Sequence, residues 1–257
     1  MMFEEPLLTR HDLDVRAREI SRSELEFTFP DQIPQLVDSE ADTSALLSRT
    51  LEEARMSIRF GSIGALAVAL SEPGVPPKGS IKEFAQYRKD LHLVIAGLQL
   101  FSSSKAPDSI RTLARAMGRV KDSRGTATQS VDDLALVHQL AGVARLGSHD
   151  PVAPKSARKR MHAREKAISH LSSGESMTEH EYHKARRHVR QLRYAYALGA
   201  TLTQDIDGPM ARTAVALLKL NNLLGTGLGS QTNEDSFQPP EQAKALLEQW
   251  KQAARVK

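Results

Sequence analysis

A row of basic side chains lies along one face of the helix predicted for residues 178–200. At 100° per residue, the row combines four guanidinium groups with one imidazole. Its members are His183, Arg186, Arg187, Arg190 and Arg193. Apolar residues such as Val189 and Leu192 fall on a separate face, so the helix packs inward and presents the basic row. Because the planar guanidinium binds phosphate oxygens with two hydrogen bonds and stays charged, the row suits a run of phosphate groups.

Shorter basic rows occur on other predicted helices. One repeats at i, i+4 and i+8 in the helix predicted for residues 108–120, another lies beside an apolar face in 80–102, and a third opens 156–172. Taken singly, each row is typical of a solvated face. If two helical units pack so that the rows converge, they form a groove for an extended polyanion. The residues expected to support binding there are Arg88, His92, Arg115, Arg119, Arg158 and Arg164.

The net charge of +4 hides an uneven distribution. Residues 1–54 contain 13 acidic and 5 basic residues, whereas residues 155–193 contain 11 basic and 4 acidic residues together with five histidines. A segment of 39 residues therefore carries a larger positive charge than the whole chain, which favours a polyanionic partner. The acidic segment is expected to fold over the basic surface and compete with that ligand.

The composition excludes several classes of protein. The chain has 257 residues and no cysteine, which rules out disulfide frameworks, thiolate zinc sites, iron–sulfur clusters and thiol catalysis. The longest apolar run, around residues 61–70, is too short to span a bilayer, and no export signal is visible. We therefore expect a cytoplasmic protein that does not enter a membrane.

Proline and glycine divide the chain into segments with apolar residues at 3.6-residue spacing, which predicts an all-α fold. The expected helices are Thr43–Leu70, Ser80–Ser102, Asp108–Val120, Ser130–Leu146, Ser156–Ser172, Thr178–Ala200, Gly208–Leu224 and Pro239–Arg255. Asp42 is expected to cap the first helix, which bends at Gly61 and Gly64, and Gly225 is expected to end the seventh. The segment Leu25–Phe29 alternates like a short strand.

A weak internal repeat relates the two halves of the chain. The matches occur in the same order at nearly equal offsets, which is the signature of a duplicated structural unit. The matching pairs are Arg88 with Arg186, His92 with Arg190, and residues 113–118 with residues 220–225. The sequence therefore predicts two similar four-helix units.

These observations predict the domain organisation. The stretch Gly147–Pro154 is the best break between the two units, because it is rich in residues that favour turns. We expect an acidic N-terminal extension at 1–42 and a helical domain at 43–257. The halves of that domain are 43–150 and 151–257.

The segment 183–195 resembles the characteristic helix of the CHAD family, whose name stands for conserved histidine α-helical domain. Its sequence, His-Lys-Ala-Arg-Arg-His-Val-Arg-Gln-Leu-Arg-Tyr-Ala, is similar to the family pattern His-x-x-Arg-Lys-x-x-Lys-Arg-Leu-Arg-Tyr-Ala. In the first half, Arg88 corresponds to the first Arg of the pattern, and residues 98–101 correspond to the family's terminal Leu-Arg-Leu-Phe. Ala85 stands where the pattern has a His. Residues 117–122 are similar to the family's Leu-Gly-x-x-Arg-Asp turn.

This resemblance implies both a fold and a function. The fold is an all-α domain of two pseudo-symmetric four-helix bundles, and the function is non-enzymatic binding of inorganic polyphosphate through basic residues. The departures in the first half imply a binding surface dominated by the second half. No cofactor is expected.

Other functions remain open at this point. A metal site is not indicated, since His180 and His183 are three residues apart, the metalloprotease helix has different spacing, and no third ligand is evident. Nucleic acid is the main alternative partner, because a basic helix with tyrosines also suits a phosphate backbone and Tyr194 falls on the basic row. An aromatic content of 5% offers few side chains for stacking on bases. A protein-interaction scaffold and an undetected phosphohydrolase are the remaining alternatives.

Overall fold

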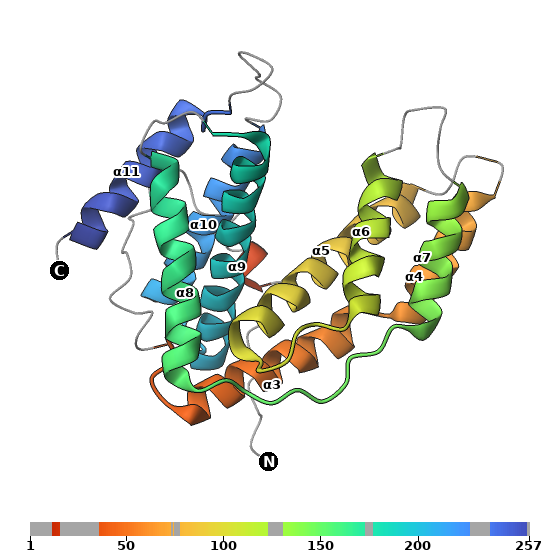
Figure 1. Cartoon of the computed structure of the whole chain (residues 1–257), viewed down its shortest axis with the longest axis horizontal. Coiled ribbons are helices and arrows are strands. Elements are labelled where there is room, and N and C mark those ends of the chain that lie inside the picture. Colours follow the sequence, from red (N-terminus) through yellow and green to blue (C-terminus); the bar gives the residue numbers. More distant parts are fainter. Residues whose placement is uncertain are drawn as a thin grey trace. The chain divides into compact units, whose positions relative to one another are not determined.

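The computed structural model describes residues 12–15, 36–72, 74, 78–122, 131–172, 177–226 and 237–255. These residues form α-helices and one short 3₁₀-helix without any strand, which confirms the all-α prediction (Figure 1). The predicted strand Leu25–Phe29 lies outside the described residues. No helix in the described part of the chain is both long and apolar enough to cross a bilayer.

The chain divides into two compact units. We call Leu47–Pro151 the central unit, and Met1–Leu46 together with Val152–Lys257 the terminal unit. Helix α3 contributes residues to both units.

The central unit is built from four helices and the larger part of α3. The elements are α3 (Glu40–Ser57), α4 (Phe60–Ser71), α5 (Lys78–Phe101), α6 (Asp108–Asp122) and α7 (Val131–Val143). Helix α7 packs against α4 and α6, and α5 packs against α6 and α4 (Figure 1). Phe84, Leu91 and Met117 are among the buried side chains of this unit, so its core is made by the apolar faces of these helices.

The helix predicted at Thr43–Leu70 is two helices, so that prediction was wrong. The break falls at Ile58 and Arg59 rather than at the two glycines, because Arg59 adopts φ −89° and ψ 85° and Ile58 is buried. Helix α3 also begins earlier than expected. Ser39 precedes its first turn, the Asp42 carboxylate accepts from the Ser39 backbone N–H at 3.0 Å, and Ser39 Oγ accepts from the Asp42 N–H at 3.1 Å. Ser39 is therefore the cap, and Asp42 is its reciprocal partner in the first turn.

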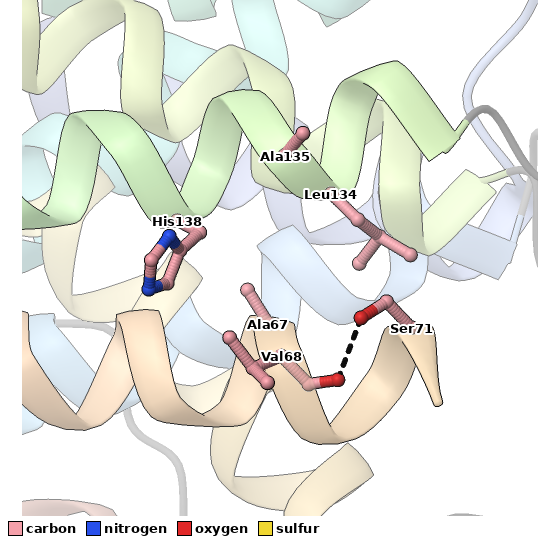
Figure 2. A pocket seen from close by; sticks show the side chains of 6 residues that line it. All are labelled: Ala67, Val68, Ser71, Leu134, Ala135 and His138. Atoms are coloured by element: carbon pink, nitrogen blue, oxygen red, sulfur yellow. Dashed lines mark hydrogen bonds between the residues drawn. The ribbon is translucent and has the colours of Figure 1, made fainter. Parts of the chain in front are cut away.

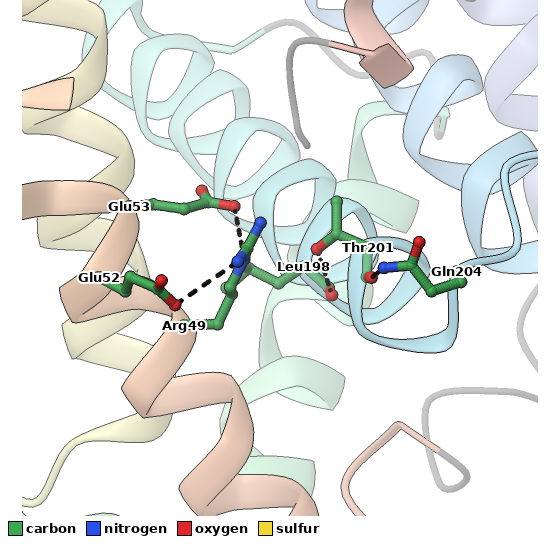
Figure 3. Close-up of polar contacts among 6 residues, drawn as sticks. All are labelled: Arg49, Glu52, Glu53, Leu198, Thr201 and Gln204. Carbon is green, nitrogen blue, oxygen red and sulfur yellow. Dashed lines mark hydrogen bonds and ion pairs between the residues drawn. The ribbon is translucent and has the colours of Figure 1, made fainter. Parts of the chain in front are cut away.

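Ion pairs within α3 also stabilise it. Arg49 lies between two carboxylates one turn further on, with Nη1 3.5 Å from Glu52 Oε2 and Nε 3.3 Å from Glu53 Oε1 (Figure 3). Pairs at i, i+3 and i+4 of this kind contribute a few tenths of a kcal/mol each. Arg49 therefore has a structural role within α3.

The terminal unit is built around α9. Its elements are α8 (Pro154–Ser169), η1 (His170–Ser172), α9 (Glu179–Thr203), α10 (Pro209–Thr226) and α11 (Glu241–Arg255). Helix α9 packs against α8 and α10, and α11 packs against α8, η1 and α10 (Figure 1). Tyr182, Tyr194 and Tyr196 of α9 are fully buried, so aromatic packing fixes the helix in the unit.

Both ends of α9 are fixed by specific residues. Thr178 and Glu181 form a capping box, in which the Thr178 hydroxyl accepts from the Glu181 N–H and the Glu181 carboxylate accepts from the Thr178 N–H. The helix ends at Gln204, which adopts φ 54° and donates from Nε2 to the Thr201 carbonyl at 2.8 Å (Figure 3). The predicted helix Thr178–Ala200 is thus confirmed, with one more turn at its end.

Candidate functional site

The basic row on α9 is presented at its N-terminal end. His183 is 45% exposed, and its Nε2 lies 3.3 Å from Glu179 Oε1 in the preceding turn. Arg187 is exposed and makes no hydrogen bond or ion pair with other described residues, whereas Arg186 and Arg190 are half-buried. Three arginines and a histidine therefore share two turns of one helix, which concentrates positive charge where an anion can reach it.

Arg186 is held against the end of α10. A Cβ atom added at Gly225 would lie 2.6 Å from Arg186 Nη2, and the Arg186 Nε is buried. Gly225 lies inside the last turn of α10, so its prediction as the residue that ends the helix was wrong. A guanidinium near the carboxyl end of a helix is stabilised by the helix dipole. Arg186 is therefore partly a structural residue that needs a glycine beside it.

Two other predicted binding residues contact the acidic N-terminal part of the chain. Arg193 forms an ion pair with Asp14, and Arg158 Nη1 lies 3.2 Å from Asp38 Oδ1. Leu13, beside Asp14, is buried. Carboxylates of the acidic segment thus lie on the basic surface, and buried apolar packing holds the chain beside one of them.

Arg164 belongs to α8, and its side chain contacts α9. Its Nε donates to Gln191 Oε1 at 2.6 Å, and its Nη1 donates to the Arg160 carbonyl at 2.6 Å. Burial, with a smaller contribution from the Arg160 charge, lowers the pKa of Arg164 to about 10, so it remains charged at neutral pH. The sequence places this residue on a basic face, whereas the structure places it in the contact between two helices.

His188 is a residue that the sequence analysis missed. It lies off the basic row, half-buried, with Nδ1 3.2 Å from the same Gln191 Oε1 that Arg164 contacts. Burial lowers the pKa of the His188 imidazole, and the charges of Arg164, Lys184 and Arg187 lower it further, against the opposing effect of the Gln191 hydrogen bond. A wheel of α9 alone does not reveal this group, because its partner Arg164 comes from α8.

We call these residues of α8 and α9 the seam cluster. It consists of Arg164, Lys184, Arg187, His188 and Gln191. Four of its five members can carry a positive charge, and the fifth is a neutral amide.

The central unit holds its predicted binding residues differently. A Cβ added at Gly118 would lie 3.2 Å from Arg88 Nη2, and the Arg88 Nε is buried without a hydrogen-bond partner among the described residues. Arg119 is paired with Asp133 through Nε at 2.8 Å and Nη2 at 2.7 Å, which raises the pKa of its guanidinium. His92 is half-buried, and Arg115 is exposed. Only part of this second set is therefore available to an external anion.

A small pocket lies elsewhere in the central unit. It has a volume of about 170 Å³ between α4 and α7 and is lined by Ala67, Val68, Ser71, Leu134, Ala135 and His138 (Figure 2). None of the predicted binding residues lines it, and its walls are mostly apolar. Within the described ranges, no group of three or more His, Asp or Glu side chains is arranged to hold a metal ion.

The chain matches no model of a known protein family, no curated protein and no solved structure. The chemistry of the site therefore follows from the residues described above. Those residues offer guanidinium, ammonium and imidazole groups, which hold anions through charge-assisted hydrogen bonds.

Proposed function

We propose that the protein binds inorganic polyphosphate through the basic surface of the terminal unit and performs no catalysis on it. The observation that carries the proposal is the row of Arg186, Arg187 and Arg190, with His183, on a helix fixed by buried tyrosines. Consecutive phosphate groups along a flexible chain can each accept hydrogen bonds from successive guanidinium groups. Phosphate, rather than a carboxylate, matches this arrangement best because it accepts on several oxygens.

Family membership and internal symmetry belong to the same proposal. The resemblance of 183–195 to the CHAD helix favours polyphosphate as the ligand. In the central unit, Arg88 of α5 lies against Gly118 near the end of α6. In the terminal unit, Arg186 of α9 lies against Gly225 near the end of α10. This shared feature supports two pseudo-symmetric units derived from one repeat, at the positions where the sequence matches were found.

A matched pair of double variants tests the binding site. Arg187→Gln with Arg190→Gln removes two charges, three residues apart, from α9, and Arg115→Gln with Arg119→Gln removes two charges, four residues apart, from α6. The α9 variant should bind long-chain polyphosphate at least about tenfold more weakly, with a salt dependence reduced by about 0.7 per lost contact. The α6 variant should change affinity about threefold or less. Titration calorimetry at several salt concentrations measures both, and equal effects would contradict the site assignment.

The tyrosines of α9 argue against nucleic acid as the partner. Tyr194 falls on the basic row in the sequence, yet it is only 1% exposed, and Tyr182 and Tyr196 are equally buried. A buried ring cannot stack on a base, which removes the feature that favoured single-stranded nucleic acid. Competition of long-chain polyphosphate against single-stranded and duplex DNA at equal phosphate concentration decides between the two. A preference for DNA would overturn the proposed ligand.

The two remaining alternatives have direct tests. A phosphohydrolase would release phosphate from polyphosphate or nucleotides in the presence of divalent metal ions. A scaffold would retain a protein partner in a pull-down from which polyphosphate had been removed by a polyphosphatase. Under our proposal, no phosphate is released, and phosphorus NMR of the denatured protein detects polyphosphate that was bound during purification.

A further inference from the structure

The seam cluster contains a half-buried cation, Arg164. The acceptors that Arg164 uses among the described residues are neutral, namely the Gln191 amide oxygen and the Arg160 carbonyl. Half-buried guanidinium groups are normally balanced by a carboxylate or another anion. Arg164 thus has its hydrogen bonds partly satisfied, and the described groups that accept them carry no charge.

The hydrogen bonds of the cluster define the state of the neighbouring imidazole. A guanidinium can only donate, so the Gln191 atom 2.6 Å from Arg164 Nε is its oxygen. The same oxygen lies 3.2 Å from His188 Nδ1, so Nδ1 must carry the hydrogen and donate it. In the neutral ring, Nε2 is then the nitrogen without a hydrogen. His188 is therefore held as one tautomer, with Nε2 able to take up a proton.

All the charged groups that act on His188 in the described part of the chain are cationic. Arg164 faces it from α8, and Lys184 and Arg187 lie on its own helix. No charged group of α10, the other helix packed against α9, contributes. A proton on His188 would add one more positive charge to this group, which disfavours the imidazolium form, and a bound anion would offset that repulsion.

We propose that the seam cluster is a proton-coupled phosphate subsite. One phosphate group is held by Arg164, Lys184 and Arg187, and His188 takes one proton from solvent on Nε2 and donates it as a hydrogen bond to a phosphate oxygen. No covalent bond is made or broken. The inference rests on the proposed function for its polyphosphate source, but the same chemistry accepts free orthophosphate.

This subsite makes binding depend on pH in a defined direction. Because the bound anion favours the imidazolium form, the pKa of His188 rises when phosphate binds. By linkage, affinity for phosphate must then increase as the pH falls through the range between the free and bound pKa values. The stability of the free protein depends on pH in the opposite direction. Because folding lowers the pKa of His188, the neutral imidazole contributes fully to stability above the pKa of a histidine in the unfolded chain, and this contribution is lost as the pH falls.

NMR of the histidine side chains tests the subsite directly. The imidazole of His188 is titrated in the whole protein without ligand, with long-chain polyphosphate and with orthophosphate. We expect its pKa to rise with polyphosphate, and the affinity measured by calorimetry to be about tenfold higher at pH 6 than at pH 8. The inner phosphates of a long chain keep a constant charge over this range, so the change in affinity comes from a group on the protein.

Two histidine variants provide the comparison. His188→Gln should lose most of the pH dependence of polyphosphate affinity, whereas His162→Gln, which changes an exposed histidine of α8 paired with Glu165, should keep it. Polyphosphate binding without any change in the pKa of His188 would overturn the subsite and leave the proposed function intact. A rise with orthophosphate alone would support the subsite and overturn polyphosphate as the ligand, and the absence of both effects would overturn both proposals.

Discussion

Helix α9 of the terminal unit and helix α5 of the central unit place an arginine in the same setting but differ in the charges around it. Arg186 and Arg88 both lie against a glycine, and two residues further on the chain has His188 in α9 but Asp90 in α5. Asp90 is 5% exposed and accepts from Gln86 Nε2 at 3.1 Å. The central unit thus carries a carboxylate in α5, whereas the terminal unit has at the matching position of α9 a histidine surrounded by cations. From this difference we propose that charge balance, more than helix arrangement, decides which unit accepts an external anion.

The largest effect is expected from removing the buried anion of the central unit. Asp90→Asn replaces a carboxylate oxygen with an amide N–H₂ in a buried position, where that donor has to find a new partner. We expect a loss of about 2 kcal/mol in the free energy of unfolding, measured by urea denaturation. The exposed Asp132→Asn serves as the control and should change stability by less than about 0.5 kcal/mol. Polyphosphate affinity should not fall in either variant, and a loss of affinity in the Asp90 variant would contradict the division between the units.

The converse change gives the terminal unit its own anion. His188→Asp places a carboxylate beside Arg164 and Gln191, where it offsets the positive charge of the seam cluster. We expect affinity for long-chain polyphosphate at low salt to fall about tenfold, or about 1.4 kcal/mol. At pH 8, where the imidazole is least protonated, His188→Asn, which has nearly the same size and no charge, should lose no more than about threefold. If both variants lose affinity equally, the imidazole matters by its shape and not by the charge balance.

The sequence predicted the helices well because local signals define them. Proline and glycine between segments of 3.6-residue spacing, and a Thr–Glu pair at the start of α9, act within a few residues. The break at Ile58 was not predictable in this way, because the apolar pattern continues through it and neither flanking residue is a helix breaker. The cap of α3 was misplaced by three residues, since Ser39 and Asp42 both suit that position and only the hydrogen bonds distinguish them.

The site was predicted less completely than the fold, because a helical wheel describes one helix without its neighbours. Wheel position placed Tyr194 on the basic row, but packing within the terminal unit buries it. Arg164 looked exposed for the same reason, although it contacts Gln191 of α9. The ion pair of Arg193 with Asp14 joins residues far apart in the chain, so no local pattern could indicate it.

The two arginine–glycine contacts differ in how tightly they fit, and alanine variants measure that difference. In Gly225→Ala the new Cβ would be 2.6 Å from Arg186 Nη2, so the guanidinium must move, whereas in Gly118→Ala the distance of 3.2 Å to Arg88 Nη2 requires only a small adjustment. We expect the first variant to bind polyphosphate about fivefold more weakly, which is about 1 kcal/mol, and the second to be unchanged within about twofold. Both gain helix propensity, so affinity measured by calorimetry separates them better than stability does. Equal affinities would show that Arg186 binds no phosphate.

The smallest effect on affinity is expected from the two carboxylates of the acidic N-terminal part that pair with arginines of the terminal unit. Asp14→Asn with Asp38→Asn removes the ion pairs to Arg193 and Arg158 and keeps the buried packing of Leu13. If these carboxylates compete with the ligand, the double variant should bind polyphosphate about threefold more tightly, since surface ion pairs of this kind contribute about 0.2–1 kcal/mol.

The control for this variant removes two acids from the central unit. Glu52→Gln with Asp132→Asn changes the net charge by the same amount, so it measures the general effect of charge on attraction of a polyanion. The gain in the Asp14 and Asp38 variant should exceed that of the control at low salt and disappear at high salt, because exposed charges are then screened. A gain no larger than the control would mean that the acidic segment acts only through net charge. A larger gain would mean that its carboxylates occupy positions that phosphate groups take when the ligand binds, which is the behaviour of an internal competitor.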